Sequence, residues 1–456
     1  MRDLTTIVKA YDIRGLVPDE LDEMTAREFG AAFAALVADA GTVVVGHDMR
    51  ESSPGLVAAF ADGVTSQGLD VLDMGLASTD MLYFASGWLG HPGAQFTASH
   101  NPARYNGIKL CYAGARPVGQ DSGLGRLREW VESGTTPRVR DGRAGTVASR
   151  DLTGDYAAHL RKLVDVSAAR PLTVVVDAGN GMAGHTVPRV FEGLPFRLVP
   201  MYFELDGSFP NHEANPIEPE NLRDLRAKVR EVGADIGLAF DGDADRVFVV
   251  DERGEPVSPS VVTALVAVRE LAKDPGAPII HNLITSRAVP EIVREHGGTP
   301  IRTRVGHSFI KATMAETGAV FGGEHSGHFY FRDFWRADSG MLAALHVLAA
   351  LGEQRRPLSE LLGEYSRYVA SGEINSRVAD QAAAIDELER HFLDRAGVTT
   401  DRLDGLTVEL PHGAWFNVRA SNTEPLLRLN VEAPDEAAMV ALRDEVLGII
   451  RPGGGA

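Results

Sequence analysis

The sequence predicts an α/β protein: three similar α/β units, each with a mixed or mainly parallel sheet, followed by a smaller α+β unit. Three observations support this fold class. Short runs of valine, isoleucine and leucine alternate with segments in which apolar residues recur every three or four positions. A strand, a helix and a second strand in this order form right-handed crossovers and therefore parallel pairs. After residue 369 the order changes to a helix, alternating strands and a final helix, which is typical of an α+β unit.

The length of 456 residues agrees with this division, because domains usually contain about 100–200 residues. We predict domains at 1–150, 151–255, 256–368 and 369–456. The polar segment SGEINS, residues 371–376, is interpreted as the linker before the last domain.

The first unit begins with an amphipathic helix predicted in residues 21–41. Thr25 and Glu28 match a capping box at its start, and Gly41 is a stop signal at its end. The next elements, in order, are a buried strand at 42–48, a helix at 52–68 and a strand at 69–75.

The later units continue in the same manner. The glycines of DAGNGMAG match neither the dinucleotide pattern nor the P-loop pattern, so we interpret them as packing glycines. The predicted elements, in order, are a strand and glycine-rich turn at 172–184, two strands around an acidic loop at 234–251, a strand, turn and helix at 277–298, a helix at 381–397, strands at 405–410 and 414–420, and a helix at 435–450.

Composition and charge restrict the classes of function. The chain has one cysteine, Cys111, and shows neither an apolar signal segment nor an apolar run of about 18 residues, so we expect a cytoplasmic protein. Its 63 acidic and 45 basic side chains give a net charge of −18. This charge disfavours nucleic acids and anionic membranes as partners. An anionic ligand would require locally gathered arginine and lysine.

The segment AFDGDADRVFVVD predicts a cation site. Asp241, Asp243 and Asp245 occupy alternate positions, so their carboxylates point to one side of an extended loop and repel each other without a cation. Oxygen ligands suit Mg²⁺ or Ca²⁺. The alternatives are a solvated acidic turn and an EF-hand loop, but an EF-hand needs glycine where Arg246 stands.

The segment TASHNP contains a candidate nucleophile, Ser99, with His100 beside it. It lacks the G-x-S-x-G elbow of serine hydrolases. In the following strand Ile108 and Leu110 alternate inward, so Lys109 faces the other side and offers a cation for phosphate chemistry. The alternative is a serine that merely caps a turn.

The segment RASNTEP predicts a phosphate site in the acidic chain. An arginine fork and backbone N–H groups in a polar turn both bind anions. The alternative is an ordinary asparagine turn after a strand. The candidate residues are Arg419, Ser421, Asn422, Thr423 and, a few positions on, Arg428.

In GEHSGH, residues 323–328, the side chains of Glu324, Ser326 and His328 alternate among glycines and converge as a group that suits sugar hydroxyls. A transition-metal site and a purely structural turn are the alternatives, although the helical spacing of a zinc site is absent. Weaker candidates are Tyr11, Arg14 and His307.

Together these motifs resemble the α-D-phosphohexomutase superfamily, and within it the phosphomannomutase/phosphoglucomutase family. TASHNP, DGDADR, GEHSGH and RASNTEP occur in the order and at the separations typical of that family, over nearly the whole chain. The resemblance implies three similar α/β domains and a fourth of another type around a central cleft. It also implies reversible interconversion of hexose 6-phosphate and hexose 1-phosphate, of mannose, glucose or both.

The resemblance further implies a role for each motif. Ser99 would carry the phosphoryl group, and Mg²⁺ would be held by the aspartates and the phosphate on Ser99, with hexose 1,6-bisphosphate as intermediate and activator. GEHSGH would contact the sugar, and RASNTEP and Arg428 the distal phosphate. The positions that match cleft residues of relatives are Tyr11, Arg14, His100, Lys109, Arg246, His307 and His328.

One departure concerns the sugar preference: Ile284 stands where many bacterial relatives carry lysine. The alternatives for function are a Mg²⁺-dependent sugar phosphatase, a non-catalytic phosphosugar-binding protein and a mutase for an amino-sugar phosphate. We expect a monomer or weak homodimer whose partner is a small phosphosugar.

Overall fold

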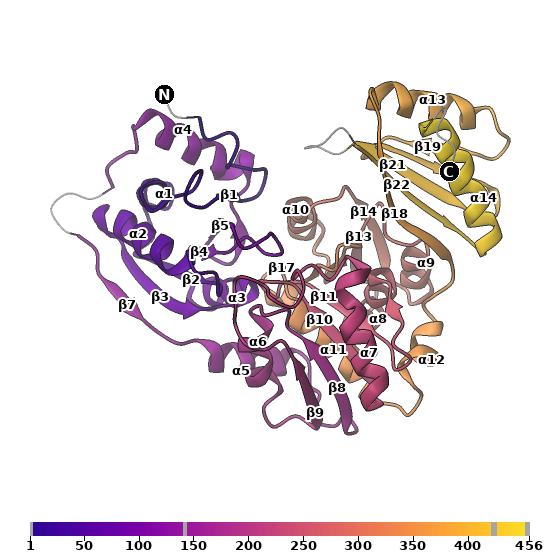
Figure 1. Ribbon diagram of the computed structural model, residues 1–456, viewed down its shortest axis with the longest axis horizontal. Helices are drawn as coiled ribbons and strands as arrows, with labels where there is room; N and C mark the ends of the chain where they lie inside the picture. The colour runs from indigo at the N-terminus through magenta and orange to yellow at the C-terminus, as the bar shows by residue number, and fades with distance from the viewer. Residues whose placement is uncertain (1–2, 140–143, 421–425, 452–456) are drawn as a thin grey trace.

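The computed structural model describes residues 3–139, 144–420 and 426–451, apart from the side chains of residues 307 and 308. These residues form four sheets (Figure 1). The first and fourth sheets lie at opposite ends of the view, and the second and third lie between them. The predicted fold class is confirmed.

The first sheet is mixed, with the order β1-β5-β4-β2-β3-β7, and β6 pairs with β5. β2 is parallel to β3 and β4, while β5 is antiparallel to β1 and β4. The strands are β1 (Ile13–Leu16), β2 (Thr42–His47), β3 (Asp70–Leu76), β4 (Gly93–Phe96), β5 (Tyr105–Tyr112), β6 (Arg116–Pro117) and β7 (Val147–Ser149), and the helices are α1 (Glu23–Leu36), α2 (Ser53–Ser66), α3 (Thr79–Leu89) and α4 (Gly125–Ser133).

Both faces of this sheet are covered by helices. Because successive side chains of a strand point to opposite faces, the apolar residues at successive positions of β2 are buried on both sides. Val43 and Val45 face the core formed with α1, α2 and α4, whereas Val44 faces the core that contains α3. The polar loops at the ends of the strands are therefore the places left for a site.

The second and third sheets repeat the mixed plan, with orders β12-β11-β10-β8-β9 and β14-β13-β15-β16-β17. Their strands are β8 (Leu172–Asp177), β9 (Phe196–Met201), β10 (Ile236–Phe240), β11 (Val247–Val250), β12 (Pro256–Val257), β13 (Pro278–Asn282), β14 (Thr299–Thr303), β15 (Phe321–Gly323), β16 (Phe329–Phe331) and β17 (Ala337–Asp338). Their helices are α5 (Thr153–Leu163), α6 (Ala183–Phe191), α7 (Arg223–Val232), α8 (Pro259–Lys273), α9 (Ala288–Glu295), α10 (His307–Thr317), α11 (Gly340–Gly352) and α12 (Leu358–Gly363). β12 extends the second sheet two residues beyond the predicted boundary at 255; the boundaries themselves stay a prediction.

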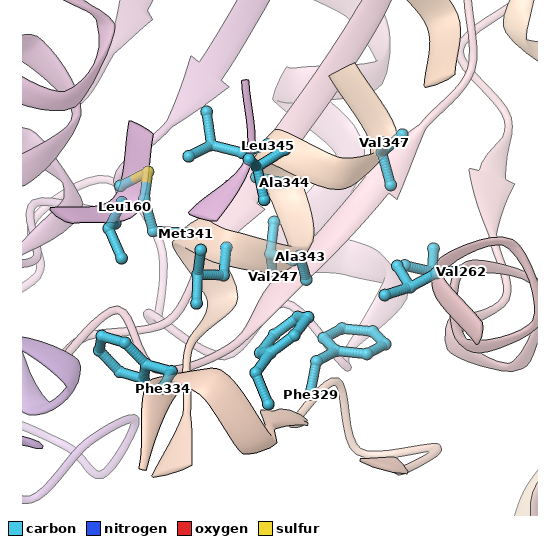
Figure 2. Packing of buried hydrophobic residues seen from close by; sticks show 14 of the residues in the cluster. Leu160, Val247, Val262, Phe329, Phe334, Met341, Ala343, Ala344, Leu345 and Val347 are labelled. Atoms are coloured by element: carbon cyan, nitrogen blue, oxygen red, sulfur yellow. The ribbon is translucent and has the colours of Figure 1, made fainter. Parts of the chain in front are cut away.

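One continuous apolar core joins the first three units. It runs from Val44 of β2 through Leu160 of α5 to Phe329 of β16. Figure 2 shows its centre, where Met341 and Leu345 of α11 lie among side chains of the neighbouring elements. Loops from different units are therefore held against one another by a shared packed interior.

The fourth sheet differs in pairing and in core. Its order is β18-β22-β21-β20-β19, with all neighbours antiparallel. Its cluster of buried residues runs only from Ile385 to Ile450. The elements are β18 (Val369–Arg377), β19 (Thr399–Asp401), β20 (Leu406–Glu409), β21 (Trp415–Ala420), β22 (Leu426–Ala433), α13 (Gln381–Leu393) and α14 (Glu436–Ile450).

Two local predictions are wrong. Residues 371–376 are not a linker, because they belong to β18. The cap of α1 is Asp22, whose carboxylate accepts from the Thr25 N–H at 2.7 Å, and the helix ends at Leu36, before Gly41. Among the described residues, every helix is too short or too polar to cross a bilayer.

Candidate active site

Ser99 lies beside the aspartate loop although 142 positions separate it from Asp241. Its loop connects β4 to β5, and the serine is almost buried with φ of +50°, a left-handed conformation that costs energy outside glycine. Its Oγ donates a hydrogen bond to Asp241 Oδ2 at 2.7 Å and lies 3.2 Å from His100 Nδ1. The hydroxyl therefore contacts a carboxylate of the second unit instead of merely capping a turn.

Arg50 holds the Ser99 loop in place. Its guanidinium is buried and donates to four backbone carbonyl oxygens of the loop: those of Ser99 at 2.9 Å, Asn101 at 2.6 Å, Pro102 at 2.9 Å and Tyr105 at 2.9 Å. Each bond joins a buried, charged donor to a backbone carbonyl, and hydrogen bonds from charged donors are strong. The clamp explains how the strained serine is maintained.

A buried carboxylate orients this arginine in turn. Asp48 accepts from the Arg50 backbone N–H at 3.0 Å, from Arg50 Nε at 3.1 Å and from Ser53 Oγ at 2.7 Å. Burial raises the pKa of Asp48, while the Arg50 charge opposes the shift. This pair is absent from the residues predicted for the site, although the sequence carries a signal for it: an aspartate and an arginine directly after a buried strand, in GHDMRESS.

The aspartate loop lies between the antiparallel strands β10 and β11, as the flanking apolar runs predicted. Glycines hold it close to the Ser99 loop: a Cβ on Gly242 would lie 2.3 Å from Ser99 O, and one on Gly181 would lie 2.6 Å from Gly242 O. Met182 N–H also donates to Gly242 O at 2.9 Å. The glycines of DAGNGMAG therefore pack against the loop, as predicted.

Cations partly neutralise the three carboxylates, all of which are buried. Lys109 Nζ lies 2.7 Å from Asp243 Oδ2 and 2.7 Å from Asp245 Oδ2, and Arg246 Nε donates to Asp241 Oδ2 at 2.9 Å. Thr79 Oγ1 donates to Asp243 Oδ2 at 2.5 Å. Lys109 thus faces the site, as predicted from the alternation of its strand.

The carboxylates differ in acidity for physical reasons. Burial raises the pKa of Asp241 to about 8, and the charges of Asp245 and Asp243 add to this shift while Arg246 opposes it. Burial acts in the same direction on Asp243, but its ion pair with Lys109 outweighs this and holds the pKa of Asp243 well below its usual range. Burial would lower the pKa of Lys109, yet the two aspartates raise it well above its ordinary value.

The carboxylates fit a hard divalent cation. One oxygen from each of Asp241, Asp243 and Asp245 lies within 4.8 Å of the others. Asp243 Oδ1 and Asp245 Oδ1 are buried and accept no hydrogen bond from the described residues. Buried carboxylate oxygens without donors suit an ion that takes oxygen ligands, such as Mg²⁺.

His100 and Arg14 lie on the other side of Ser99. His100 Nδ1 accepts from Arg246 Nη2 at 2.6 Å, and burial together with the charges of Arg246 and Arg14 lowers the pKa of His100 well below its ordinary value. Arg14 Nη1 donates to Asn101 Oδ1 at 2.6 Å. His100 is therefore a neutral acceptor that orients Arg246.

A small cavity of about 40 Å³ adjoins the aspartates and is lined from three units. His328 Nε2 lies 3.6 Å from Asp245 Oδ1, so GEHSGH (residues 323–328, the candidate sugar-binding segment, called the sugar loop below) reaches the aspartate loop. A buried ion pair between Lys311 Nζ and Asp338 Oδ1, at 2.7 Å, borders the same place. The lining residues are Tyr11, Asp12, Tyr83, Lys109, Leu110, Pro117, Asp245, His328 and Asp338.

The sugar loop converges as predicted. Ser326 Oγ lies 3.0 Å from His328 Nδ1, which in turn lies 3.9 Å from Glu324 Oε2. Glu324 is buried; it accepts from Tyr330 OH at 2.7 Å and from the Gly306 N–H at 3.1 Å. These bonds fix the direction of the carboxylate.

The candidate phosphate residues Arg419 and Arg428 lie on β21 and β22, apart from the Ser99 loop. Both donate to Glu373 of β18, from Arg419 Nη2 at 2.9 Å and from Arg428 Nη1 at 3.1 Å. Ser421, Asn422 and Thr423 lie outside the described residues, as does the side chain of His307. Ile284 is buried.

Models of one protein family match all four units. The matches are "Phosphoglucomutase/phosphomannomutase, alpha/beta/alpha domain I" at residues 5–129, domain II at 154–254, domain III at 259–368 and the C-terminal domain at 373–449. Together they span most of the chain.

Individual relatives are similar over their full length. A protein of Xanthomonas campestris pv. campestris named "Phosphohexose mutases" is 43% identical, covering 97% of this chain and 98% of the relative. A "Phosphomannomutase" of Salmonella typhimurium is 41% identical, covering 97% and 98%. A solved structure from Burkholderia thailandensis, a "Phosphoglucomutase/phosphomannomutase family protein", has a TM-score of 0.89 and 36% identity, covering 100% of this chain and 99% of the other.

Proposed function

The chain belongs to the phosphoglucomutase/phosphomannomutase family, and from this premise we propose that it interconverts hexose 6-phosphate and hexose 1-phosphate through a phosphoserine at Ser99. Mannose and glucose are the proposed sugars, and hexose 1,6-bisphosphate is the proposed intermediate and activator. One observation carries the assignment of the nucleophile: Ser99 Oγ lies 2.7 Å from Asp241 Oδ2 at the edge of a buried cluster of carboxylates and cations. The cations of this cluster, Lys109 and Arg246, would stabilise the negative charge on the oxygens of a phosphate carried by Ser99.

In the first half-reaction the free hydroxyl of a hexose monophosphate attacks the phosphorus on Ser99 Oγ. A sugar O–P bond forms and the serine O–P bond breaks. The sugar hydroxyl loses its proton, and Ser99 Oγ gains one, which restores the hydroxyl seen here on Asp241. The second half-reaction reverses these steps with the other phosphate of the bisphosphate.

Phosphoryl transfer depends on positioning and on stabilisation of charge. Lys109 Nζ, fixed between Asp243 and Asp245, is the proposed cation for the transferring oxygens. A lysine paired with two carboxylates retains its proton, so we assign proton acceptance from the sugar to His328, which lines the same cavity. Arg246 and Arg14 act from the His100 side of the serine.

Asp241, Asp243 and Asp245 would hold Mg²⁺ together with the phosphate on Ser99. When bound, the ion would stabilise negative charge on the phosphoryl oxygens as a Lewis acid. This assignment is supported by Asp243 Oδ1 and Asp245 Oδ1, two buried carboxylate oxygens to which no described residue donates a hydrogen bond.

The other end of the substrate is assigned to the sugar loop and the fourth sheet. Glu324 and Ser326 would contact sugar hydroxyls, and Arg419 and Arg428 the phosphate that does not react. Tyr11, His307, Ser421, Asn422 and Thr423 complete the proposed set on the strength of their motifs. A site that grips a phosphate at either end of the sugar permits both orientations of the bisphosphate.

The test compares the wild type with Ser99→Ala and with Ser149→Ala, an exposed serine of β7. We expect the intact mass of the wild type to include one phosphate that Ser99→Ala lacks. With Mg²⁺ and mannose or glucose 1-phosphate, Ser99→Ala should lose at least about 10³-fold in kcat/KM, and Ser149→Ala should match the wild type. Accumulation of inorganic phosphate without isomer would indicate a phosphatase, and full turnover by Ser99→Ala would refute the nucleophile.

A further inference from the structure

A bulge in β18 places one carboxylate between two arginines. The register of β18 against β22 shifts between Ala370 and Glu373, and Gly372 within the bulge has φ of +69°. Only glycine adopts such a backbone at little cost. The strand therefore bends at this point, and Glu373 is the first residue after the bulge that pairs again with β22.

The two arginines need that carboxylate. Arg419 and Arg428 are direct cross-strand partners on β21 and β22, and like charges in such positions repel. Glu373 Oε2 accepts from Arg419 Nη2 at 2.9 Å, and Glu373 Oε1 accepts from Arg428 Nη1 at 3.1 Å. Each carboxylate oxygen serves one guanidinium, so the three side chains carry a net charge of +1 instead of +2.

Within the part of the chain that the structure describes, the pair nevertheless retains donors that no acceptor meets. Arg419 Nε and Arg428 Nε are buried and have no hydrogen-bond partner among the described residues. His325 Nδ1 is in the same condition. Burial lowers the pKa of His325; the charge of Glu373 opposes this shift and the charge of Arg419 adds to it, so His325 is within electrostatic reach of the arginine pair. Buried N–H groups without acceptors favour an added anion.

We propose that Glu373 is a resident counter-anion that weakens the grip of Arg419 and Arg428 on a substrate phosphate. This inference rests on the proposed function. A bisphosphate that must turn end over end has to leave the distal site once in each catalytic cycle. Two arginines with a total charge of +2 would bind a phosphate dianion more tightly and would slow its release. With Glu373 between them, the pair still binds the phosphate but releases it faster.

The test removes the charge and keeps the shape. Glu373→Gln should lower the Kd for inorganic phosphate, measured by calorimetry on the full chain, by roughly tenfold. In the mutase assay it should lower both KM and kcat, because tighter binding of the distal phosphate slows turning. Glu373→Asp keeps the charge and should stay within about threefold of the wild type in Kd. The matched control is Glu387→Gln. Glu387 is an exposed glutamate on α13 of the same unit, so this variant should leave the Kd for phosphate, KM and kcat unchanged.

Other outcomes overturn the proposal in identifiable ways. If Glu373→Gln weakens phosphate binding, Glu373 orients the arginines instead of opposing the ligand, and the proposal is wrong. If KM rises while kcat is unchanged, the same conclusion follows. If the wild type has no mutase activity and Glu373→Gln still binds phosphate more tightly, the proposed function fails while the role of Glu373 stands. If the circular dichroism of Glu373→Gln differs from that of the wild type, the charge-conserving variant Glu373→Asp becomes the test. If Glu373→Asp has the circular dichroism of the wild type but its Kd for inorganic phosphate differs tenfold, the effect of Glu373 is not one of charge and the proposal is wrong.

Discussion

The Ser99 centre and the arginine pair of the fourth sheet both gather charged side chains, but they differ in burial and in how firmly these side chains are fixed. At Ser99 the serine and its carboxylate partner Asp241 are buried, and Arg50 fixes the loop through four carbonyl oxygens. At the arginine pair, Arg428 and Glu373 keep 33% and 27% of their side-chain surface exposed, and one carboxylate holds both arginines. On the proposed function, the reacting end of the substrate would meet a rigid arrangement, and the distal end would meet one that can yield.

The same contrast holds between the units that carry the two sites. The first three sheets share one apolar core, whereas the fourth has its own. Its described contacts with the third unit include polar ones, such as Arg302 Nη1 to Asp401 Oδ2 at 2.5 Å and the Arg287 N–H to Glu432 Oε1 at 2.9 Å. A shared core resists relative movement, while polar contacts exchange with water at little cost.

After loss of the proposed nucleophile itself, the largest expected effect comes from loosening the rigid centre. Arg50→Lys removes the fork that holds four carbonyls, so the Ser99 loop should lose its fixed geometry. We expect kcat to fall by roughly 10²–10³-fold with KM within about threefold, because a misplaced nucleophile affects the transition state more than binding. Steady-state kinetics with mannose 1-phosphate measures both values.

The matched control for Arg50→Lys is Arg104→Lys, an exposed arginine near the same loop, which should retain wild-type kinetics. Thermal unfolding of both variants separates positioning from stability. A fall in Tm for Arg50→Lys with kcat unchanged would show that the clamp serves folding alone.

The contrast between the two sites also separates what the sequence reveals from what it conceals. Sheet class, the strands around the aspartate loop and the inward alternation that exposes Lys109 follow from apolar periodicity, which is a local property. That Ser99 meets Asp241 came from recognising four motifs together. Arg50 was missed because its partners are backbone carbonyls of another loop, and no pattern of side chains marks them.

The segment 371–376 was misread for a related reason. β18 is an edge strand and is mostly exposed, so it has no apolar alternation to distinguish it from a loop. Gly372 then looks like a linker residue, although it forms a bulge. The cap of α1 was misplaced by three residues because Thr25 and Glu28 also match a capping box, while Asp22 has the carboxylate in reach.

A second prediction tests the joint of the first three units. Asp80 of α3 is buried and accepts from Ser78, from Tyr156 of α5 at 2.6 Å and from Ser339, the cap of α11, at 2.6 Å. Burial raises the pKa of Asp80 to about 6, although these hydroxyls oppose the shift. Because the folded state binds the proton more tightly than the unfolded state, the contribution of Asp80 to stability falls as pH rises from about 4 to about 6, and it is level above that range.

Asp80→Asn does not titrate, so the difference in unfolding free energy between wild type and variant should shrink by about 2 kcal/mol between pH 4.5 and pH 7.5. Urea unfolding at the two pH values measures this difference. A difference that is the same at both pH values would show that folding does not raise the pKa of Asp80.

The smallest effect is expected where the fourth unit is attached, and it tests whether that attachment is loose. Arg367, in the connection between α12 and β18, forms two hydrogen bonds to Glu295 of α9, at 2.6 and 2.5 Å, but both side chains are substantially exposed. Exposed pairs contribute little and are screened by salt. Glu295→Gln should therefore change kcat/KM by less than about twofold. The matched control is Glu192→Gln, which removes an exposed ion pair with Arg189 within the second unit and should have an equally small effect. A tenfold loss of kcat/KM in Glu295→Gln, absent from Glu192→Gln, would mean that this pair governs the placement of the arginines. In that case the difference between Glu295→Gln and the wild type should disappear at 1 M NaCl, and the fourth sheet would have to be counted with the rigid part of the site.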